Sequence, residues 1–181
     1  MEIIETRIQG LRILKTSVHR DERGYFLEMF RSSALLDAGI DIEWTQDNLS
    51  VSHRKVVRGM HYQVEHPQAK LVQVAHGALF DLVIDLRRSS PTFGNHVSVE
   101  LKAGDGAALL IPIGCAHGFA ALQSDTALLY KVSDSYCPQG ERTILWNDPD
   151  LGIVWPFAED EVIISEKDRR GSLFKHADVF P

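Results

Sequence analysis

The chain has 181 residues, of which 44% are hydrophobic and 24% are charged. This length supports one folded domain with a sizeable core but is short for two independent ones, so we expect a single domain over residues 1–181. The formal net charge of -6, from 25 acidic and 19 basic residues, argues against a nucleic-acid-binding surface or a basic helix lying on a membrane. An anionic ligand would therefore need a local basic pocket.

The N-terminal residues lack the basic start and apolar run of a secretory signal, and no apolar stretch approaches the ~20 residues of a membrane span. Cys115 and Cys137 do not make a disulfide framework in a chain of this length. We expect a soluble, unprocessed protein in the reducing cytoplasm.

Short runs of β-branched, aromatic and other apolar residues, separated by turn residues, dominate the chain. The first helical signal covers 33–38, with Ser32 or Ser33 as the N-cap and Gly39 as the stop. The predicted strands then follow in chain order at 56–63, 71–75, 79–86, 96–102, 107–113 and 127–132.

Two of these strands have informative patterns. Residues 96–102 alternate between apolar and polar side chains, which is typical of a half-buried strand. In 79–86, apolar residues occupy one face and Asp81 and Asp85 the other, which indicates a strand covered on both sides. Many short strands with tight turns and little helix predict an all-β fold, an antiparallel sandwich or jelly-roll barrel with a few short helices.

The segment Val57-Arg58-Gly59-Met60-His61-Tyr62-Gln63 places a cation, a glycine and an imidazole in a strand that otherwise has a core pattern. A lone strand histidine is more often a hydrogen-bonded structural residue than a catalytic one. Lys70 begins the next strand, on the same face as Val72 and Val74. Its ammonium therefore either points into an enclosed space or extends along the surface to solvent.

A second histidine follows a turn, in Pro112-Ile113-Gly114-Cys115-Ala116-His117. Pro-x-Gly-x-x-His resembles the second half-motif of the cupin superfamily, whose jelly-roll barrels hold a site at their open mouth. The first half-motif normally has His-x-His and a glutamate seven residues before a glycine, whereas this chain has His61-Tyr62-Gln63, and Lys70 before Gly77. An amide and a cation in place of two ligands should disfavour a divalent ion and favour an anion.

Further motifs make the resemblance much closer. In chain order they are Arg23-Gly24-Tyr25-Phe26-Leu27-Glu28, Gln46-Asp47-Asn48, Arg58-Gly59-Met60-His61-Tyr62-Gln63, Gln68-Ala69-Lys70-Leu71-Val72, Asp85-Leu86-Arg87, Ser90-Pro91-Thr92-Phe93-Gly94, Ala116-His117-Gly118-Phe119, Tyr130-Lys131 and Ser165-Glu166-Lys167-Asp168. Together they resemble the dTDP-4-dehydrorhamnose 3,5-epimerase family. The resemblance implies a cupin-type jelly roll, a homodimer to which the N-terminal strands contribute, a C-terminal extension, and neither metal nor other cofactor.

The substrate implied by the resemblance is dTDP-4-keto-6-deoxy-D-glucose, whose C3 and C5 protons flank the C4 ketone. Removing either proton forms an enolate, so inversion needs a base, a donor for the oxyanion, and an acid on the opposite face. By resemblance, His61 is the base, Asp168 orients it, Lys70 stabilises the enolate and Tyr130 donates the proton. Without the resemblance, Tyr130 would be read as a core tyrosine among apolar neighbours.

The resemblance also implies the substrate contacts. Arg23 and Arg58 match diphosphate- or nucleotide-contacting positions, where guanidinium groups bind phosphate oxygens in pairs. Tyr136 resembles a tyrosine that stacks on the thymine ring. The other implied contacts are Glu28, Gln46, Asp47, Asn48, Lys70, His117, Glu141 and Lys167. In the family Arg23 and Glu28 reach across a dimer interface; without the resemblance, both would be read as residues of an exposed turn.

One expectation comes from spacing. Arg58 and His61 are three residues apart and would point to opposite faces of a regular strand. We predict that Gly59 permits a bulge or sharp twist, so that both side chains serve one cavity. A regular ladder with Arg58 facing outward would remove its phosphate role.

Three alternatives remain open from the sequence. A metal-dependent cupin enzyme would share the barrel and bind its metal through His61 and His117. A binding module that has lost catalysis would keep the fold without promoting proton exchange. Within the family, some relatives invert only C3 or only C5, and the side chains do not distinguish these because regiochemistry depends on how the ring is placed.

Overall fold

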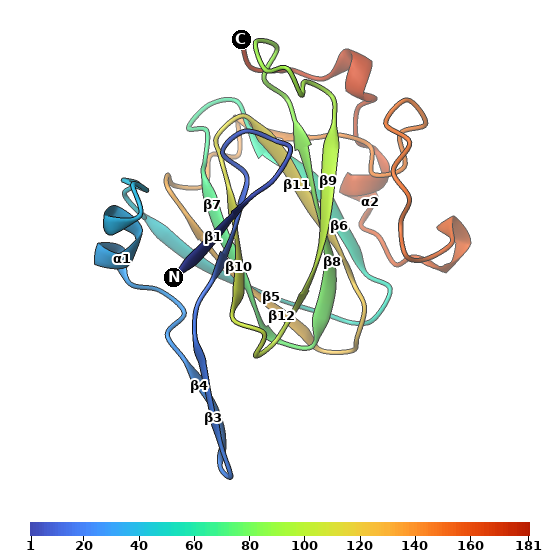
Figure 1. The fold of residues 1–181 in the computed structure, drawn as a ribbon. Coiled ribbons are helices and arrows are strands. Elements are labelled where there is room, and N and C mark those ends of the chain that lie inside the picture. Colours follow the sequence, from blue (N-terminus) through green and yellow to red (C-terminus); the bar gives the residue numbers. More distant parts are fainter.

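The computed structural model describes residues 1–181 and contains two facing antiparallel sheets, a projecting hairpin and a C-terminal extension (Figure 1). The strands are β1 (Glu2–Glu5), β2 (Arg12–Lys15), β3 (Val18–Asp21), β4 (Gly24–Leu27), β5 (Gln46–Ser52), β6 (Val57–Gln63), β7 (Lys70–His76), β8 (Ala78–Asp85), β9 (His96–Lys102), β10 (Ala107–Ile111), β11 (Cys115–Ala121), β12 (Thr126–Val132) and β13 (Glu141–Thr143). The α-helices are α1 (Ser32–Asp37) and α2 (Glu166–Arg169), and short 3-10 turns lie at Glu159–Glu161 and Phe174–His176.

The six-stranded sheet has the order β1-β2-β10-β7-β12-β5, and the five-stranded sheet has the order β13-β6-β11-β8-β9. From β5 onward the chain crosses repeatedly between the sheets, as in a jelly roll. The all-β prediction of antiparallel strands with a few short helices is therefore confirmed. No helix in the structure is long and apolar enough to cross a membrane.

The main core lies between the two sheets. Because side chains alternate along a strand, each strand turns every second residue inward, and twelve buried residues form this cluster. Val97 and Val99 on β9 pack against it, while Ser98 and Glu100 are exposed, as the alternation predicted.

The outer face of the five-stranded sheet is covered by the C-terminal extension. Trp146 and Trp155 pack with Phe80 of β8, and Ile144, Leu151 and the last turn cover β6 and β11. This cover explains why β8 is buried on both faces, as predicted. It also carries α2 to the edge of β6.

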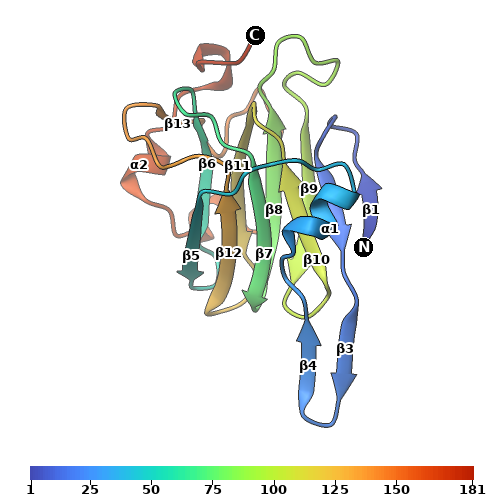
Figure 2. The ribbon, with the colours of Figure 1, turned by 90° about the vertical axis from the view of Figure 1, so that its left-hand side faces the viewer.

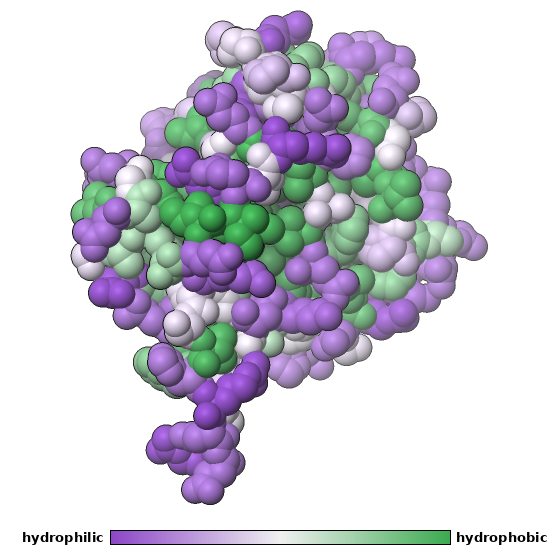
Figure 3. Space-filling view, viewed as in Figure 1, coloured by the Kyte–Doolittle hydropathy of each residue, from purple (hydrophilic) through white to green (hydrophobic).

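The outer face of the six-stranded sheet is covered only in part. Leu35 of α1 packs there with Phe30 and Leu71, while β3 and β4 extend beyond the end of the barrel (Figure 2). Apolar side chains gather on the surface near the N-terminus, whereas the tip of the hairpin is hydrophilic (Figure 3). This face is the more open of the two.

Two predicted boundaries were wrong. The strand predicted over 107–113 ends at Ile111, because Pro112 and the positive φ of Gly114 (+90°) turn the chain toward β11. The helix begins at Ser32, so its N-cap is Arg31, which makes no side-chain capping bond. Packing of Leu35 and Phe30 against the sheet, rather than a serine cap, accompanies this helix start.

Candidate active site

His61, which is partly exposed, and the buried Asp168 form a dyad. The Nε2 atom of His61 lies 2.7 Å from Oδ1 of Asp168, whose side chain is almost fully buried. The Gly59 N–H donates to the other carboxylate oxygen at 3.3 Å, and Ser165 Oγ caps α2 by accepting from the Asp168 N–H at 3.1 Å. The predicted pair is therefore brought together, and α2 aims its carboxylate at the ring.

Burial by itself raises the pKa of Asp168, but the hydrogen bond and charge of His61, helped by the Gly59 N–H, bring that pKa below its usual value. The carboxylate is ionised at neutral pH and accepts the Nε2 proton of His61. A ring that donates from Nε2 leaves Nδ1 with a free lone pair. This nitrogen can accept a proton, and Asp168 stabilises the imidazolium that forms.

A cavity of about 260 Å³ opens beside this ring. Its lining residues are Gln46, Asn48, His61, Tyr62, Gln63, Gln68, Lys70, Tyr130, Tyr136 and Glu141. They come from β5, β6, β7, β12, β13 and the adjoining loops, so both sheets contribute. Seven of the ten are site residues that the family resemblance implied.

Lys70 points into this cavity. Its Nζ donates to the His61 carbonyl oxygen at 3.5 Å, which rules out the solvent-directed alternative. Burial lowers the pKa of Lys70 to about 8, while the charges of Asp81 and Glu141 act to raise it. The ammonium form still predominates at neutral pH.

Tyr130 lies on the six-stranded sheet, on the strand next to that of Lys70, and lines the cavity with His61 of the other sheet. Burial raises the pKa of its phenol above the usual value, and the nearby charge of Arg58 partly opposes this effect. The hydroxyl therefore holds its proton at neutral pH. Since His61 is on β6 and Tyr130 on β12, the base and the phenol enter the cavity from opposing sheets.

The predicted bulge in β6 is confirmed. His61 pairs with His117 and Arg58 with Phe119, so a step of three residues on β6 opposes a step of two on β11. Gly59 has φ +134°, and a Cβ there would lie 2.5 Å from Cα of Gly118. Only glycine fits this backbone.

Beyond the bulge, Arg58 turns toward β5. Its Nε donates to Ser52 Oγ at 3.1 Å and its terminal nitrogen donates to the Val51 carbonyl at 3.3 Å. The side chain is exposed, and its charge reaches the Tyr130 hydroxyl. The guanidinium does not line the cavity, but it is open to an anion from solvent.

A hydrogen-bonded rim surrounds the mouth. The Tyr136 hydroxyl donates to Glu141 Oε2 at 2.7 Å, and Lys167 Nζ lies 2.5 Å from the same oxygen. Gln46 accepts from the Tyr136 N–H at 3.2 Å and donates to Asn48 at 2.7 Å. Burial raises the pKa of Glu141, but Lys167 and Tyr136 outweigh this and lower it.

Gln63 lines the site, although the sequence singled it out only as an amide in place of a metal ligand and gave it no role. Its amide nitrogen donates to the carbonyls of His66 (2.7 Å) and Ser135 (3.3 Å), and its oxygen accepts from the Cys137 N–H (3.0 Å). It therefore holds the loop that carries Tyr136. Its position two residues after His61, on the same strand face, was the available signal.

Six predicted contacts are not among the residues that line the cavity, namely Arg23, Glu28, Asp47, Arg58, His117 and Lys167. Asp47 sits between Gln46 and Asn48 on β5, so alternation turns it to the opposite face, where it pairs with Lys131 at 2.8 Å. Arg23 is at the tip of the hairpin and pairs with Asp21. Glu28 pairs with Arg31 and lines a different hollow.

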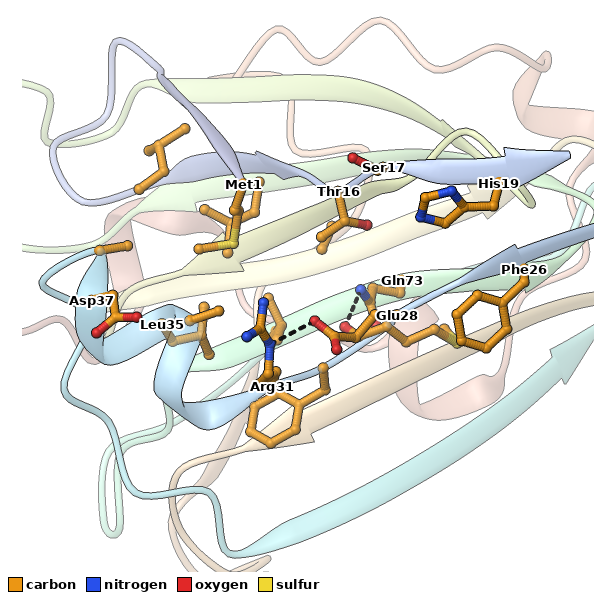
Figure 4. A pocket seen from close by; sticks show the side chains of 18 residues that line it. Met1, Thr16, Ser17, His19, Phe26, Glu28, Arg31, Leu35, Asp37 and Gln73 are labelled. Atoms are coloured by element: carbon orange, nitrogen blue, oxygen red, sulfur yellow. Dashed lines mark hydrogen bonds and ion pairs between the residues drawn. The ribbon is translucent and has the colours of Figure 1, made fainter.

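That second hollow, of about 710 Å³, lies on the outer face of the six-stranded sheet (Figure 4). It is larger than the cavity at His61, but 11 of its 18 lining residues are hydrophobic. Its polar groups include Glu28 and Arg31, which bond to each other, and Gln73, which donates to the Met29 carbonyl. Its lining points to packing rather than to proton transfer.

His117 lies directly across from His61 in the β11–β6 pairing. Both oxygens of Asp81 lie 3.0 Å from its Nε2, and both residues are buried. At the positions where a cupin barrel would place further metal ligands, this chain has Gln63 and Lys70. No three His, Cys, Asp or Glu side chains form a group able to hold a metal ion.

Comparisons with known proteins agree with one another. The sequence profile of the dTDP-4-dehydrorhamnose 3,5-epimerase family matches residues 5–176. The chain is 43% identical to dTDP-4-dehydrorhamnose 3,5-epimerase of Pseudomonas aeruginosa, with 100% of both chains covered.

Two solved structures are similar throughout. The dTDP-6-deoxy-D-glucose-3,5-epimerase of Legionella pneumophila, in complex with dTDP-4-keto-L-rhamnose, has a TM-score of 0.93 and 40% identity, covering 98% of this chain and 94% of that one. ChmJ of Streptomyces bikiniensis, a 3'-monoepimerase in complex with dTDP-quinovose, has a TM-score of 0.87 and 36% identity, covering 94% and 86%.

Proposed function

The chain belongs to the dTDP-4-dehydrorhamnose 3,5-epimerase family, and we propose how its residues carry out the reaction of that family. The protein is a nucleotide-sugar epimerase, an isomerase that acts on dTDP-4-keto-6-deoxy-D-glucose in dTDP-L-rhamnose biosynthesis. The observation that supports the proposed roles best is the entry of His61 and Tyr130 into one cavity from opposing sheets.

His61 takes the proton from the carbon beside the ketone. The C–H electron pair becomes a carbon–carbon double bond, and the ketone oxygen becomes an enolate oxygen. The imidazolium is paired with Asp168 at 2.7 Å, which favours proton uptake by the ring. Base and orienting carboxylate are both in place before substrate binds.

Lys70 stabilises the enolate oxygen, because an ammonium in a water-poor cavity interacts more strongly with an anion than it does in bulk water. Tyr130 then delivers its proton to the opposite face of the same carbon, which inverts the centre. The phenolate that remains regains a proton from solvent, and His61 releases its own. The side chains of one cavity thus supply all three roles.

The nucleotide lies toward the rim of the cavity in this proposal. Arg58 meets the diphosphate, and Tyr136, which is half-exposed, stacks on the thymine ring. Gln46, Asn48, Glu141, Lys167 and His117 contact the remaining polar groups.

The test is incubation with dTDP-4-keto-6-deoxy-D-glucose in heavy water, followed by NMR. We expect deuterium at both C3 and C5 and inversion at both. Deuterium confined to C3 or to C5 would identify a monoepimerase, the second candidate, which the similarity to ChmJ supports. Tight binding without any deuterium uptake would contradict catalysis.

We also propose that the protein acts as a homodimer in the cytoplasm. Arg23 and the exposed Phe26 lie on a hairpin that extends away from the end of the barrel where α2 and β13 lie (Figure 2). Arg23 therefore cannot reach the cavity of its own chain. A second copy on the apolar outer face would cover the 710 Å³ hollow and bring the hairpin to the partner's site.

Mixing two inactive variants tests this arrangement. His61→Asn lacks the base, and Arg23→Ala lacks the hairpin cation, but a mixed dimer contains one complete site. After random exchange half of the dimers are mixed, so about a quarter of wild-type activity should return. Activity that stays at the level of the separate variants would show that each site is built from one chain.

A further inference from the structure

Asp81 is a buried carboxylate for which the proposed reaction has no role. It lies on β8, it is 0% exposed, and His117 Nε2 is its only hydrogen-bond partner, 3.0 Å from both oxygens. Burying an ionised carboxylate costs free energy unless it is well paired. By comparison Asp85, on the same face of β8, is bonded by Arg87, Ser90 and Thr92. The Asp81 carboxylate therefore has fewer hydrogen-bond donors than that of Asp85.

The bond to Asp81 determines how His117 presents its ring. With Nε2 engaged, only Nδ1 remains for other contacts. Ser50 Oγ is the only fully buried side-chain polar atom without a partner, so Nδ1 of His117, which makes no hydrogen bond, is not fully buried. His117 pairs directly with His61, so both rings lie on the inner face of the sheet.

Asp81 also acts on Lys70 through its charge. Burial lowers the pKa of Lys70 to about 8, and among the opposing charges that of Asp81 is the largest, followed by that of Glu141. Glu141 is already paired with Lys167 at 2.5 Å, whereas Asp81 has no cationic lysine or arginine of its own.

The other titratable groups that line the cavity with Lys70 are His61 and Tyr62 on β6, Tyr130 on β12, Tyr136 and Glu141. His117 lies beside His61 on β11. The paired residue of β10 is the apolar Ile111. Asp81 bonds to His117, and His117 pairs with His61. The His61 carbonyl in turn accepts from Lys70 Nζ, so a chain of contacts joins Asp81 to the ammonium.

We propose that Asp81 is a positioning residue, whose bond fixes the ring of His117 and whose negative charge helps to hold the Lys70 ammonium at the cavity. This inference rests on the proposed function, in which Lys70 stabilises the enolate. Asp81 itself touches neither substrate nor reacting atoms.

The variant Asp81→Asn keeps the size of the side chain and removes its charge. Because the carboxylate raises the Lys70 pKa, its loss should shift the alkaline limb of the pH dependence of deuterium exchange to lower pH. We expect activity to fall on the order of tenfold at pH 8 and less at pH 6, as for a pKa change of about one unit. In 13C NMR of labelled lysine, the titration midpoint of Lys70 should move down in parallel.

Asp85→Asn is the matched control, since it removes a second buried charge from the same strand face without touching His117. It should lower stability but leave the alkaline limb and the Lys70 midpoint unchanged. If Asp81→Asn does not fold, Asp81→Glu keeps the charge but displaces the carboxylate. It should lower kcat and alter the 15N signals of His117, but it should shift the alkaline limb of the pH dependence very little.

An unchanged Lys70 midpoint in folded Asp81→Asn would overturn the inference, as would an unchanged kcat in Asp81→Glu. These outcomes differ from failure of the proposed function. If Lys70→Met retained full deuterium exchange, Lys70 would have no role in the reaction, although the NMR midpoint could still depend on Asp81.

Discussion

His61 and Asp168 are 107 residues apart in the chain, yet their side chains meet at 2.7 Å. The ring alone would be an ordinary strand histidine. A carboxylate that is held by the Gly59 N–H and by the serine cap of its own short helix fixes the ring nitrogen that faces the cavity. Reactivity at this scale depends on the partners of each ring rather than on the residue type.

Tyr130→Phe should separate proton removal from inversion. His61 would still exchange the substrate proton with solvent and return deuterium to the same face, whereas inversion should fall by about 10²–10⁴-fold. NMR in heavy water measures both events in one sample, and the KM reports whether binding survives. A parallel loss of exchange and inversion would argue against Tyr130 as the proton donor.

At the scale of the element, the bulge in β6 positions the site. One extra residue places Arg58 and His61 opposite Phe119 and His117, which share a face of β11, although three positions separate them. The bulge in turn requires the close approach of Gly59 and Gly118. Two glycines on neighbouring strands thus set the direction of two functional side chains.

Gly59→Ala should destabilise the fold severely, since its Cβ meets the Gly118 backbone at 2.5 Å and its φ is +134°. Gly24→Ala is the matched control, because Gly24 has φ +130° but nothing within 4 Å of an added Cβ. Backbone strain alone should lower the free energy of unfolding of Gly24→Ala by about 1–3 kcal/mol, and Gly59→Ala should lose more. Urea denaturation measures both; equal losses would show that the contact with Gly118 is unimportant.

The turn after β8 depends on one charged group. Asp85 accepts from Arg87 Nε at 2.8 Å, Ser90 Oγ at 2.6 Å and Thr92 Oγ1 at 2.7 Å. Burial raises its pKa, but these bonds outweigh burial and lower it from 3.8 to about 2. The ionised form is therefore favoured by folding.

A group whose pKa is lowered by folding stabilises the protein above its unfolded pKa and loses that contribution as the pH falls through the folded value. The difference in the free energy of unfolding between wild type and Asp85→Asn should be greatest at pH 7. It should shrink between about pH 4 and pH 2. Urea denaturation at several pH values provides the measurement. A difference that stays constant down to pH 2 would contradict an ionised Asp85 as its source.

In the whole molecule, the outer faces of the two sheets are covered unequally. The C-terminal extension covers the five-stranded sheet, whereas α1 and the hairpin leave part of the six-stranded sheet open. The exposed apolar side chains of Phe26, Leu49 and Val51 belong to the hairpin and to β5 of that sheet. An open apolar face of this kind is what a partner copy would bury.

Phe26→Asp should therefore weaken the proposed dimer, because it places a charge on a side chain that is 71% exposed in one chain and buried in the assembly we propose. Light scattering after gel filtration should show a shift from twice the 20.3 kDa of the chain toward the single mass. Activity should fall with dimer content. Tyr25→Ser, a less drastic change on the same hairpin, is the comparison. A Phe26→Asp variant that stays dimeric with full activity would contradict this interface.

The sequence alone predicted the all-β class, six of the thirteen strands and the bulge at Gly59, and by resemblance it proposed the base, the lysine and the tyrosine. Alternation and turn chemistry are local and can be read from neighbouring residues, while the ordered motifs pointed to the family. Only the tertiary structure decided that Asp47 turns away from Gln46 and Asn48, that Gln63 holds the loop of Tyr136, and that Asp81 bonds to His117. These relations join strands that are distant in the chain, and the register and facing of two sheets are set by packing over the whole core rather than by any local pattern.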